Sequence, residues 1–290
     1  MSSFKIAIAS GKGGVGKTTL SVLLYHQLQK AMNETISLVD CDVEEPNSRI
    51  FFPSSTQTKQ EVAIQEIPAI DTERCTFCRK CVDVCEFNAI MMVGALKHAE
   101  VNESLCHSCG ACEYVCDQHA LGTKRVAIGL MTQHQTPLGS LYEGRLEVGS
   151  VMQTRLIGML KEWGPSGHIA IYDAPPGTSC SVVETLDEMD YVVLVAEETS
   201  FGLHDLKLII RLVKALQIPF GVVINKAGLG STPLKTYLQQ QQVELLGEIP
   251  HSIPFAKASA KADIFDSMPS VIQGAIETVA QKIKHKRVEV

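Results

Sequence analysis

The stretch Gly11-Lys12-Gly13-Gly14-Val15-Gly16-Lys17-Thr18 decides the fold, because it fits the pattern G-x-x-x-x-G-K-[ST]. It follows a short apolar run at 5–9 and precedes a segment at 18–30 with helical apolar spacing. Glycines let successive backbone N–H groups point at phosphate oxygens, and the helix start adds positive partial charge. The stretch therefore predicts a phosphate site between a strand and a helix. Lys17 would reach the terminal phosphates and the Thr18 hydroxyl would bind Mg²⁺.

Outward from this loop, short unbroken apolar runs alternate with helical patterns. Helical spacing is clearest at 203–216 and 271–283. Strands that are apolar throughout and alternate with helices indicate a parallel sheet covered on both faces. We therefore expect an α/β fold with a mostly parallel sheet and helices on both faces. The further strand-sized runs lie at 36–39, 169–172, 191–196 and 220–224.

Eight of the ten cysteines gather in one segment, where the spacing C-x2-C-x2-C-x3-C occurs twice, 31 residues apart. Such close spacing suits iron–sulfur clusters, whereas structural zinc sites usually take paired C-x2-C units farther apart. Disulfides are disfavoured because no secretion signal is recognised. We expect a small duplicated domain at 63–126, inserted in a P-loop ATPase domain formed by 1–62 and 127–290. The cysteines are Cys75, Cys78, Cys81 and Cys85, then Cys106, Cys109, Cys112 and Cys116.

Composition excludes several classes of function. The formal net charge of −6 argues against general binding of nucleic acid, which needs a basic excess. No apolar run approaches the roughly 18 residues that span a bilayer. The basic segment at 282–287 lacks bulky apolar residues, so we read it as cations at a helix end and expect no membrane role. The expected location is the cytoplasm.

Residues 12–19, Lys-Gly-Gly-Val-Gly-Lys-Thr-Thr, resemble the deviant Walker A signature of the MinD/ParA/Mrp group of P-loop ATPases, which includes the nitrogenase iron protein. This resemblance implies that Lys12 reaches the partner's nucleotide in an ATP-sandwich homodimer. Residues 222–226 resemble the strand end whose asparagine reads adenine. The implied nucleotide-binding residues are Gly11, Lys12, Gly13, Gly14, Val15, Gly16, Lys17, Thr18, Thr19 and Asn225.

Two further strand ends match the family. Residues 38–42, Leu-Val-Asp-Cys-Asp, look like the start of switch I, which implies that Asp42 positions the attacking water and that Asp40 lies near the metal or the loop. Residues 171–178 resemble Walker B running into switch II, which assigns Mg²⁺ to Asp173. Open α/β sheets bind ligands at these carboxyl ends of strands. The implied catalytic set is Lys12, Lys17 and Asp42, and the implied magnesium set is Thr18, Asp40 and Asp173.

The duplicated cysteine pattern resembles two-cluster bacterial ferredoxins, in which the fourth cysteine of each run ligates the other cluster. The resemblance implies an inserted ferredoxin-like α+β domain with two [4Fe-4S] clusters. Glu86 and Asp117 stand where that pattern has proline, and acidic groups there imply a lowered potential. The implied ligand sets are Cys75, Cys78, Cys81 and Cys116 for one cluster, and Cys106, Cys109, Cys112 and Cys85 for the other.

Two cysteines and the exact function stay open. We expect Cys41 to be a small buried hydrophobe, whereas Cys180, just past switch II, either has no ligand role or bridges a metal between two chains. ATP or ADP, Mg²⁺ and two clusters are the implied cofactors. Three functions compete: ATP-gated electron transfer with an unidentified redox partner, cluster carriage to an acceptor protein, and MinD/ParA-type positioning. A ferredoxin arrangement normally retains its clusters, which favours the first.

Overall fold

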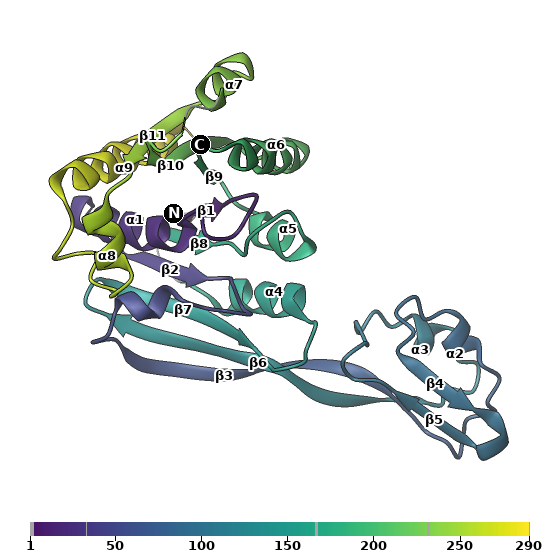
Figure 1. The fold of residues 1–290 in the computed structure, drawn as a ribbon. Coiled ribbons are helices and arrows are strands. Elements are labelled where there is room, and N and C mark those ends of the chain that lie inside the picture. Colours follow the sequence, from purple (N-terminus) through teal and green to yellow (C-terminus); the bar gives the residue numbers. More distant parts are fainter. Residues whose placement is uncertain (1–2, 33, 166–167, 231–232, 290) are drawn as a thin grey trace.

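The computed structural model describes residues 3–32, 34–165, 168–230 and 233–289, and its main feature is a nine-stranded sheet (Figure 1). The strand order is β11-β10-β9-β1-β8-β2-β7-β6-β3. From β11 to β7 all neighbours are parallel, whereas β6 and β3 are added antiparallel. The strands are β1 (Phe4–Ala9), β2 (Ile36–Asp40), β3 (Thr56–Ile70), β6 (Leu121–Thr136), β7 (Gly139–Leu146), β8 (Ile169–Asp173), β9 (Tyr191–Glu197), β10 (Phe220–Ala227) and β11 (Leu245–Pro250).

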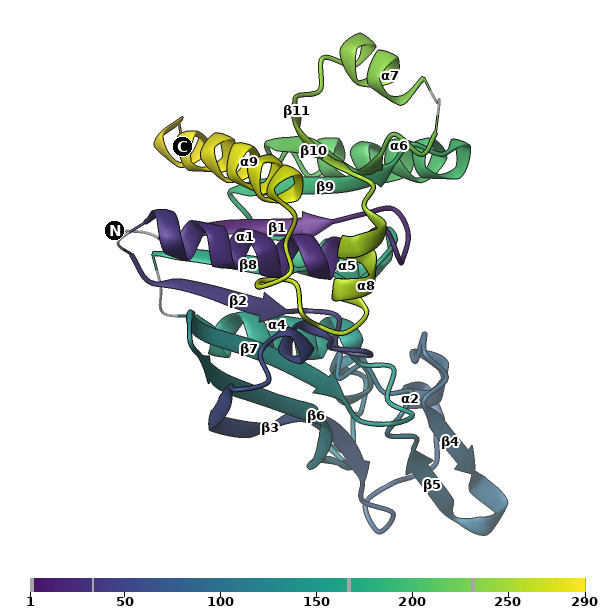
Figure 2. The same cartoon turned by 60° about the vertical axis from the view of Figure 1, so that its left-hand side comes forward.

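Helices cover both faces of this sheet, as expected (Figure 2). On one face lie α1 (Lys17–Ala31), α8 (Ile253–Ser259) and α9 (Ser270–Glu289), and on the other α4 (Gln153–Trp163), α5 (Cys180–Leu186) and α6 (Ser200–Ala215). Between β10 and β11 the chain forms α7 (Leu234–Gln240). The five strand runs and the three helical patterns singled out in the sequence are all confirmed.

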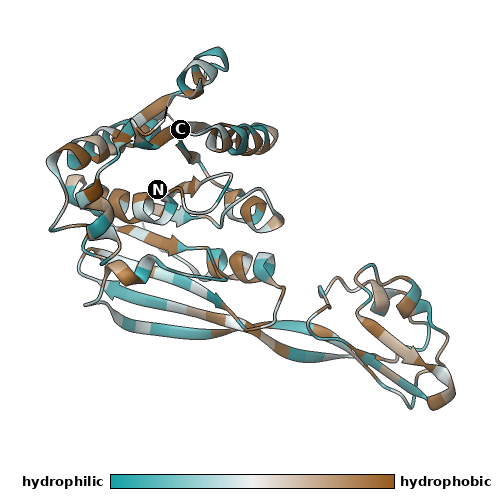
Figure 3. Ribbon diagram, in the orientation of Figure 1, coloured by the Kyte–Doolittle hydropathy of each residue, from teal (hydrophilic) through white to brown (hydrophobic). Residues whose placement is uncertain are grey.

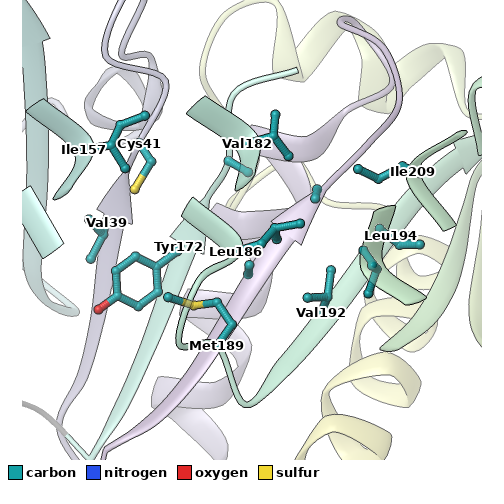
Figure 4. Packing of buried hydrophobic residues seen from close by; sticks show 14 of the residues in the cluster. Val39, Cys41, Ile157, Tyr172, Val182, Leu186, Met189, Val192, Leu194 and Ile209 are labelled. Atoms are coloured by element: carbon teal, nitrogen blue, oxygen red, sulfur yellow. The ribbon is translucent and has the colours of Figure 1, made fainter. Parts of the chain in front are cut away.

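A continuous apolar core joins the sheet to α4, α5 and α6 (Figure 4). Val39 and Tyr172 on the strands pack against helix residues such as Ile157 and Leu186. Cys41 belongs to this core and is fully buried, which confirms the expectation of a small buried hydrophobe. In the described part of the chain, no helix is long and apolar enough to cross a membrane.

The long antiparallel pair β3 and β6 was not expected, and it carries residues 71–120 away from the main sheet (Figure 1). We call this antiparallel pair of β3 and β6 the ribbon. Its first part is largely hydrophilic (Figure 3), and the exposed edge strand β3 begins Thr-Gln-Thr-Lys-Gln-Glu. Polar and charged residues on an exposed edge disfavour pairing with another chain. Lys59 also lies over the Trp163 ring of α4, 4.7 Å from its centroid. The expected domain limits at 63 and 126 fall inside these two unbroken strands.

At the far end of the ribbon is a small unit, residues 71–120, which we call the cysteine unit. It contains α2 (Lys80–Asp83), β4 (Ile90–Val93), a 3₁₀ turn η2 (Gly94–Leu96), β5 (His98–Val101) and α3 (Ala111–Tyr114). Its two halves share their backbone irregularities, because left-handed residues recur 31 positions apart. The repeat in the sequence is thus also a repeat of backbone conformation. The matching positions are Phe77 and Ser108, Arg79 and Gly110, and Asn88 and His119.

Candidate functional site

The glycine-rich loop joins β1 to α1, and two side chains of β10 form hydrogen bonds with its backbone. Asn225 donates its amide Nδ2–H to the Val15 carbonyl at 2.7 Å, and Lys226 donates to the Gly14 carbonyl at 3.2 Å. Gly16, at φ +93°, caps the start of α1 in a left-handed conformation. The exposed backbone of Gly14 and the buried Lys17 that opens α1 form the cradle that phosphate groups require.

Replacing Gly16 by alanine is expected to distort this cradle. The new Cβ would lie 2.4 Å from Asn225 Nδ2, and the residue would have to keep a positive φ. We expect a loss of about 2 kcal/mol in the free energy of unfolding and an ADP affinity at least about tenfold weaker. Chemical denaturation and calorimetric titration measure the two effects.

Gly13→Ala is the matched control in the same loop. Its Cβ would meet only the Pro176 side chain, at an ordinary 3.9 Å. The stability of this variant should stay within about 0.5 kcal/mol of the native chain. Equal destabilisation by both substitutions would contradict the conformational argument.

Two buried aspartates end adjacent strands beside the loop. Asp40 on β2 and Asp173 on β8 are register partners. Asp173 Oδ1 accepts a hydrogen bond from Ser21 Oγ at 2.9 Å, whereas its buried Oδ2 has no hydrogen-bond partner within the described residues. Burial raises the pKa of Asp173 to about 6, opposed by Thr18 and Lys17. An unsatisfied buried carboxylate oxygen, next to a loop threonine, fits a position that Mg²⁺ or its bound water completes.

Asp40 instead holds the segment that follows β2. Its Oδ2 accepts N–H groups from Asn47 at 2.9 Å and Ser48 at 2.8 Å, and its Oδ1 accepts that of Asp42 at 3.1 Å. Burial, and next the Asp173 carboxylate, raise the pKa of Asp40 to about 7. With three backbone donors on it, the Asp40 carboxylate is better placed to fix this loop than to bind metal, and its metal role stays a prediction.

Asp42, the expected water-positioning residue, is half-buried on the same side. Burial raises the pKa of its carboxyl, and the neighbouring Lys17 counteracts this effect. Burial in turn lowers the pKa of Lys17, opposed by Asp173, Asp42 and Asp40. The structure thus brings Lys17 and the three predicted aspartates into one charged cluster.

Lys12, the second loop lysine, contacts its own chain. Its Nζ lies 3.5 Å from Glu197 Oε2 at the end of β9, and Lys226 Nζ lies 2.5 Å from the other oxygen of the same carboxylate. On the opposite side of the loop, Gly177 donates its N–H to the Ser10 carbonyl at 3.0 Å. Cys180 is exposed at the first position of α5, just beyond that segment.

A cavity of about 260 Å³ opens between the start of α1 and the segment after β11. Thr19 and Asn225 line it, as expected for a nucleotide base near the loop. The sequence analysis did not predict the opposite wall, which consists of the end of β11 and the segment that follows it. The strand β11 is short and has too few apolar residues to be recognised from the sequence. Ser21 was missed as well, although it lies one helical turn after Lys17. The missed wall is Ile249, Pro250, His251, Ser252, Phe255, Ala256 and Ser259.

In the cysteine unit, each of two cavities takes three cysteines from one repeat and the fourth from the other. The first cavity measures about 240 Å³. The second measures about 20 Å³. We call them the first and second cysteine sites. The first contains Cys75, Cys78, Cys81 and Cys116, and the second contains Cys85, Cys106, Cys109 and Cys112.

Backbone N–H groups point at the sulfurs in both sites. Phe77 donates to Cys75 Sγ at 3.4 Å, and Ala89 donates to Cys85 Sγ at 3.3 Å. Within the described residues, no group of three or more His, Cys, Asp and Glu side chains converges to hold a single metal ion. By the chemistry of their donors, four thiols that line one cavity, with N–H groups donating to their sulfurs, fit a multi-atom iron–sulfur cluster.

The parallel sheet, the glycine-rich loop and the aspartates at the strand ends define a P-loop nucleotide-binding protein. Residues 6–265 match the family described as CbiA, the CobQ/CobB/MinD/ParA nucleotide binding domain. Because this match covers most of the chain, the chain belongs to that family and is a MinD/ParA-like ATPase. An uncharacterized protein of Methanocaldococcus jannaschii is 31% identical over 288 residues, covering 97% of this chain and 96% of that relative.

More distant similarities link the chain to a protein named for iron-sulfur cluster carriage and to a solved MinD structure. The iron-sulfur cluster carrier protein of Pyrococcus abyssi is 23% identical over 304 residues, covering 98% of this chain and 86% of the relative. The septum site-determining protein MinD of Pyrococcus horikoshii, solved with Mg-ADP, is 16% identical. Its TM-score is 0.59, and the match covers 97% of this chain and 96% of that one. This structural match shows the fold.

Proposed function

We propose that the protein is a dimeric ATPase that carries two [4Fe-4S] clusters and couples its nucleotide state to electron transfer with a redox partner. The observation that carries this proposal is the pair of cysteine sites, each built crosswise from both repeats. Crossed ligation is the arrangement of ferredoxins that hold two clusters for electron transfer. The bound clusters would each supply one-electron chemistry.

The protonation and the hydrogen bonding of the cysteine thiols both affect how a cluster would bind. Burial raises the pKa of Cys112 to about 11 and raises that of Cys106 and Cys81. Because iron binds the thiolate form, ligation has to displace the protons of these thiols. Backbone N–H groups that point at the sulfurs then stabilise the negative charge of the thiolates.

The nucleotide site supports hydrolysis by in-line attack of water. Lys17 would neutralise charge on the terminal phosphates, and Thr18 and Asp173 would hold Mg²⁺. Asp42 orients the attacking water. Lys12 of a second chain completes the site, for which it must leave Glu197 of its own chain. Hydrolysis is therefore tied to dimer formation in this proposal.

A connected segment links this site to the cysteines. Asp40 binds the N–H groups of Asn47 and Ser48, and the chain then continues into β3. After β3, Asp71 donates its N–H to the Ala120 carbonyl at 2.8 Å, and the Asp71 carbonyl accepts the Cys75 N–H at 3.0 Å. A shift of the loop after β2 on loss of the γ-phosphate would move the base of the ribbon that carries the clusters.

The test is a redox titration of anaerobically purified protein with ADP, with a non-hydrolysable ATP analogue, and without nucleotide. We expect the midpoint potentials to shift between these states. The Lys17→Ala chain, which cannot hold the terminal phosphates, should show no shift under any condition. Identical potentials in all states of the native chain would contradict the coupling.

Cluster carriage is the second candidate, favoured by relatives that are named iron-sulfur cluster carrier proteins. It predicts that clusters leave the protein on incubation with an apo-protein that lacks its own cluster. Size-exclusion chromatography followed by iron analysis of both proteins measures this transfer. Retention of both clusters favours electron transfer, and rapid loss to the acceptor favours carriage.

A further inference from the structure

The two cysteine sites have the same backbone but different charges. At the first site, Lys80 lines the cavity together with Cys78 and Cys116. Lys80 Nζ forms an ion pair with Asp117 Oδ2, 2.5 Å away, and Asp117 also lines this cavity. The equivalent position in the second repeat is Ala111, which lines the second cavity and likewise opens its helix.

Two arginines add to the positive charge at the first site. Arg74 precedes Cys75 and donates to the Gln118 carbonyl at 3.3 Å, and Gln118 lines this cavity. Arg79 follows Cys78 and donates to the carbonyl of another lining residue, Met92, also at 3.3 Å. Both guanidinium groups are thereby held near the first site.

The second site is apolar and faces an acidic neighbour. No Lys, Arg, Asp or Glu is among the described residues that line its cavity. Instead, the rings of Phe87 and His107 stack at 3.8 Å between centroids and line the cavity together. Glu113 directly follows Cys112 and lies in the same helix α3, so a carboxylate adjoins a ligand of the second site.

The cysteine thiols of the second site are also more buried than those of the first site. At the second site Cys106 and Cys112 are buried and Cys85 is half-buried. At the first site the three corresponding cysteines are all half-buried, and one cysteine of each site, Cys78 or Cys109, is exposed. The cavities differ as well, at about 240 Å³ for the first and about 20 Å³ for the second. The first site therefore has fewer buried thiols than the second.

The hydrogen bonds to the cysteine sulfurs are equivalent in the two repeats, so they do not distinguish the two sites. The N–H of Ala120 donates to Cys116 Sγ at 3.4 Å, and that of Ala89 donates to Cys85 Sγ at 3.3 Å. Charge and exposure are thus the properties in which the two sites differ. Reduction adds one negative charge to a cluster, and that charge is stabilised by nearby cations and water and destabilised by nearby anions.

We propose that the two sites are a polarised pair, in which a cluster at the first site has the higher potential and is reduced first. This inference rests on the proposed function, since it requires both clusters. With clusters bound, the electron given up at the second site would be the electron taken up at the first, so that one site is oxidised and the other reduced by one electron. The first site is then the one that holds the electron in the singly reduced protein.

The repeat supplies matched variants for the test. Dithionite titration of the anaerobically purified full chain, followed by electron paramagnetic resonance, gives both midpoint potentials. We expect Lys80→Ala to lower only the higher potential and Ala111→Lys to raise only the lower one, so that each narrows the gap. Lys97→Ala, which removes a cation that lines neither cavity, should shift neither potential.

The single-site variants assign the signals. Cys109→Ser should leave the higher-potential cluster, and Cys78→Ser the lower one. Two clusters of equal potential, or the reverse order, overturn this inference and leave the proposed function intact. Iron and sulfide contents near zero in the native chain overturn both. If a serine variant does not fold, the Lys80→Ala and Ala111→Lys shifts in the eight-cysteine chain still decide the outcome.

Discussion

Replacing Cys116 by serine is expected to remove the cluster at the first cysteine site, although Cys116 belongs to the second repeat. Iron should fall from about eight to about four atoms per chain, with sulfide falling in parallel. The reason is geometric, because Cys116 lines the same cavity as Cys75, Cys78 and Cys81. The one-turn helix α3, which contains Cys112, precedes Cys116 and separates it from the loop that holds Cys106 and Cys109.

Paired substitutions separate crossed from consecutive ligation by iron analysis alone. In the crossed arrangement, Cys78→Ser with Cys116→Ser damages one site and still leaves about four iron atoms, whereas Cys109→Ser with Cys116→Ser damages both sites and leaves almost none. Consecutive ligation would reverse these two results and contradict the proposal. Cys180→Ser is the control for an exposed thiol outside the unit, and full iron content in it would also remove Cys180 as a ligand.

The phosphate loop and its strand were predictable because their signals are local. The positive φ at position 16 requires a glycine, and Lys17 follows it on the first turn of α1. The sequence motif therefore determines the local backbone geometry almost completely. The parallel strands were also recognisable. Strands such as β9 are buried on both faces, which demands an unbroken apolar run.

The ribbon could not be predicted in the same way. The first residues of β3 are exposed and polar, so they lack the apolar alternation that marks a half-buried strand. Their pairing with β6 joins residues up to 79 positions apart, as for Thr56 with Gln135. The role of Asp40 as a loop anchor was equally hidden, since it depends on backbone N–H groups at 47 and 48 and on no side-chain type.

Replacing Lys12 by alanine is expected to lower ATP hydrolysis about a thousandfold, as does loss of a charge supplied in trans to a transferring phosphate. Nucleotide affinity of the single chain should change less than about fivefold, because Lys12 contacts a partly exposed glutamate in its own chain. Phosphate release and calorimetric titration measure the two effects. Lys5→Ala, a surface lysine paired with Glu188, is the control and should retain the native rate.

Mixing two inactive variants tests whether Lys12 acts across the dimer. Lys12→Ala keeps its own Asp42 and Lys17, and an Asp42→Asn chain can offer it a second Lys12. In an equal mixture, half of the dimers would be mixed and each would hold one complete site, so about a quarter of the native rate should return. If Lys12 acts within its own chain, the mixture shows no recovery.

The variant Glu197→Gln tests whether the contact between Lys12 and Glu197 competes with dimer formation. This substitution frees Lys12 without removing it, so dimers should form at a lower protein concentration than in the native chain. An unchanged concentration would mean that the contact does not compete with assembly.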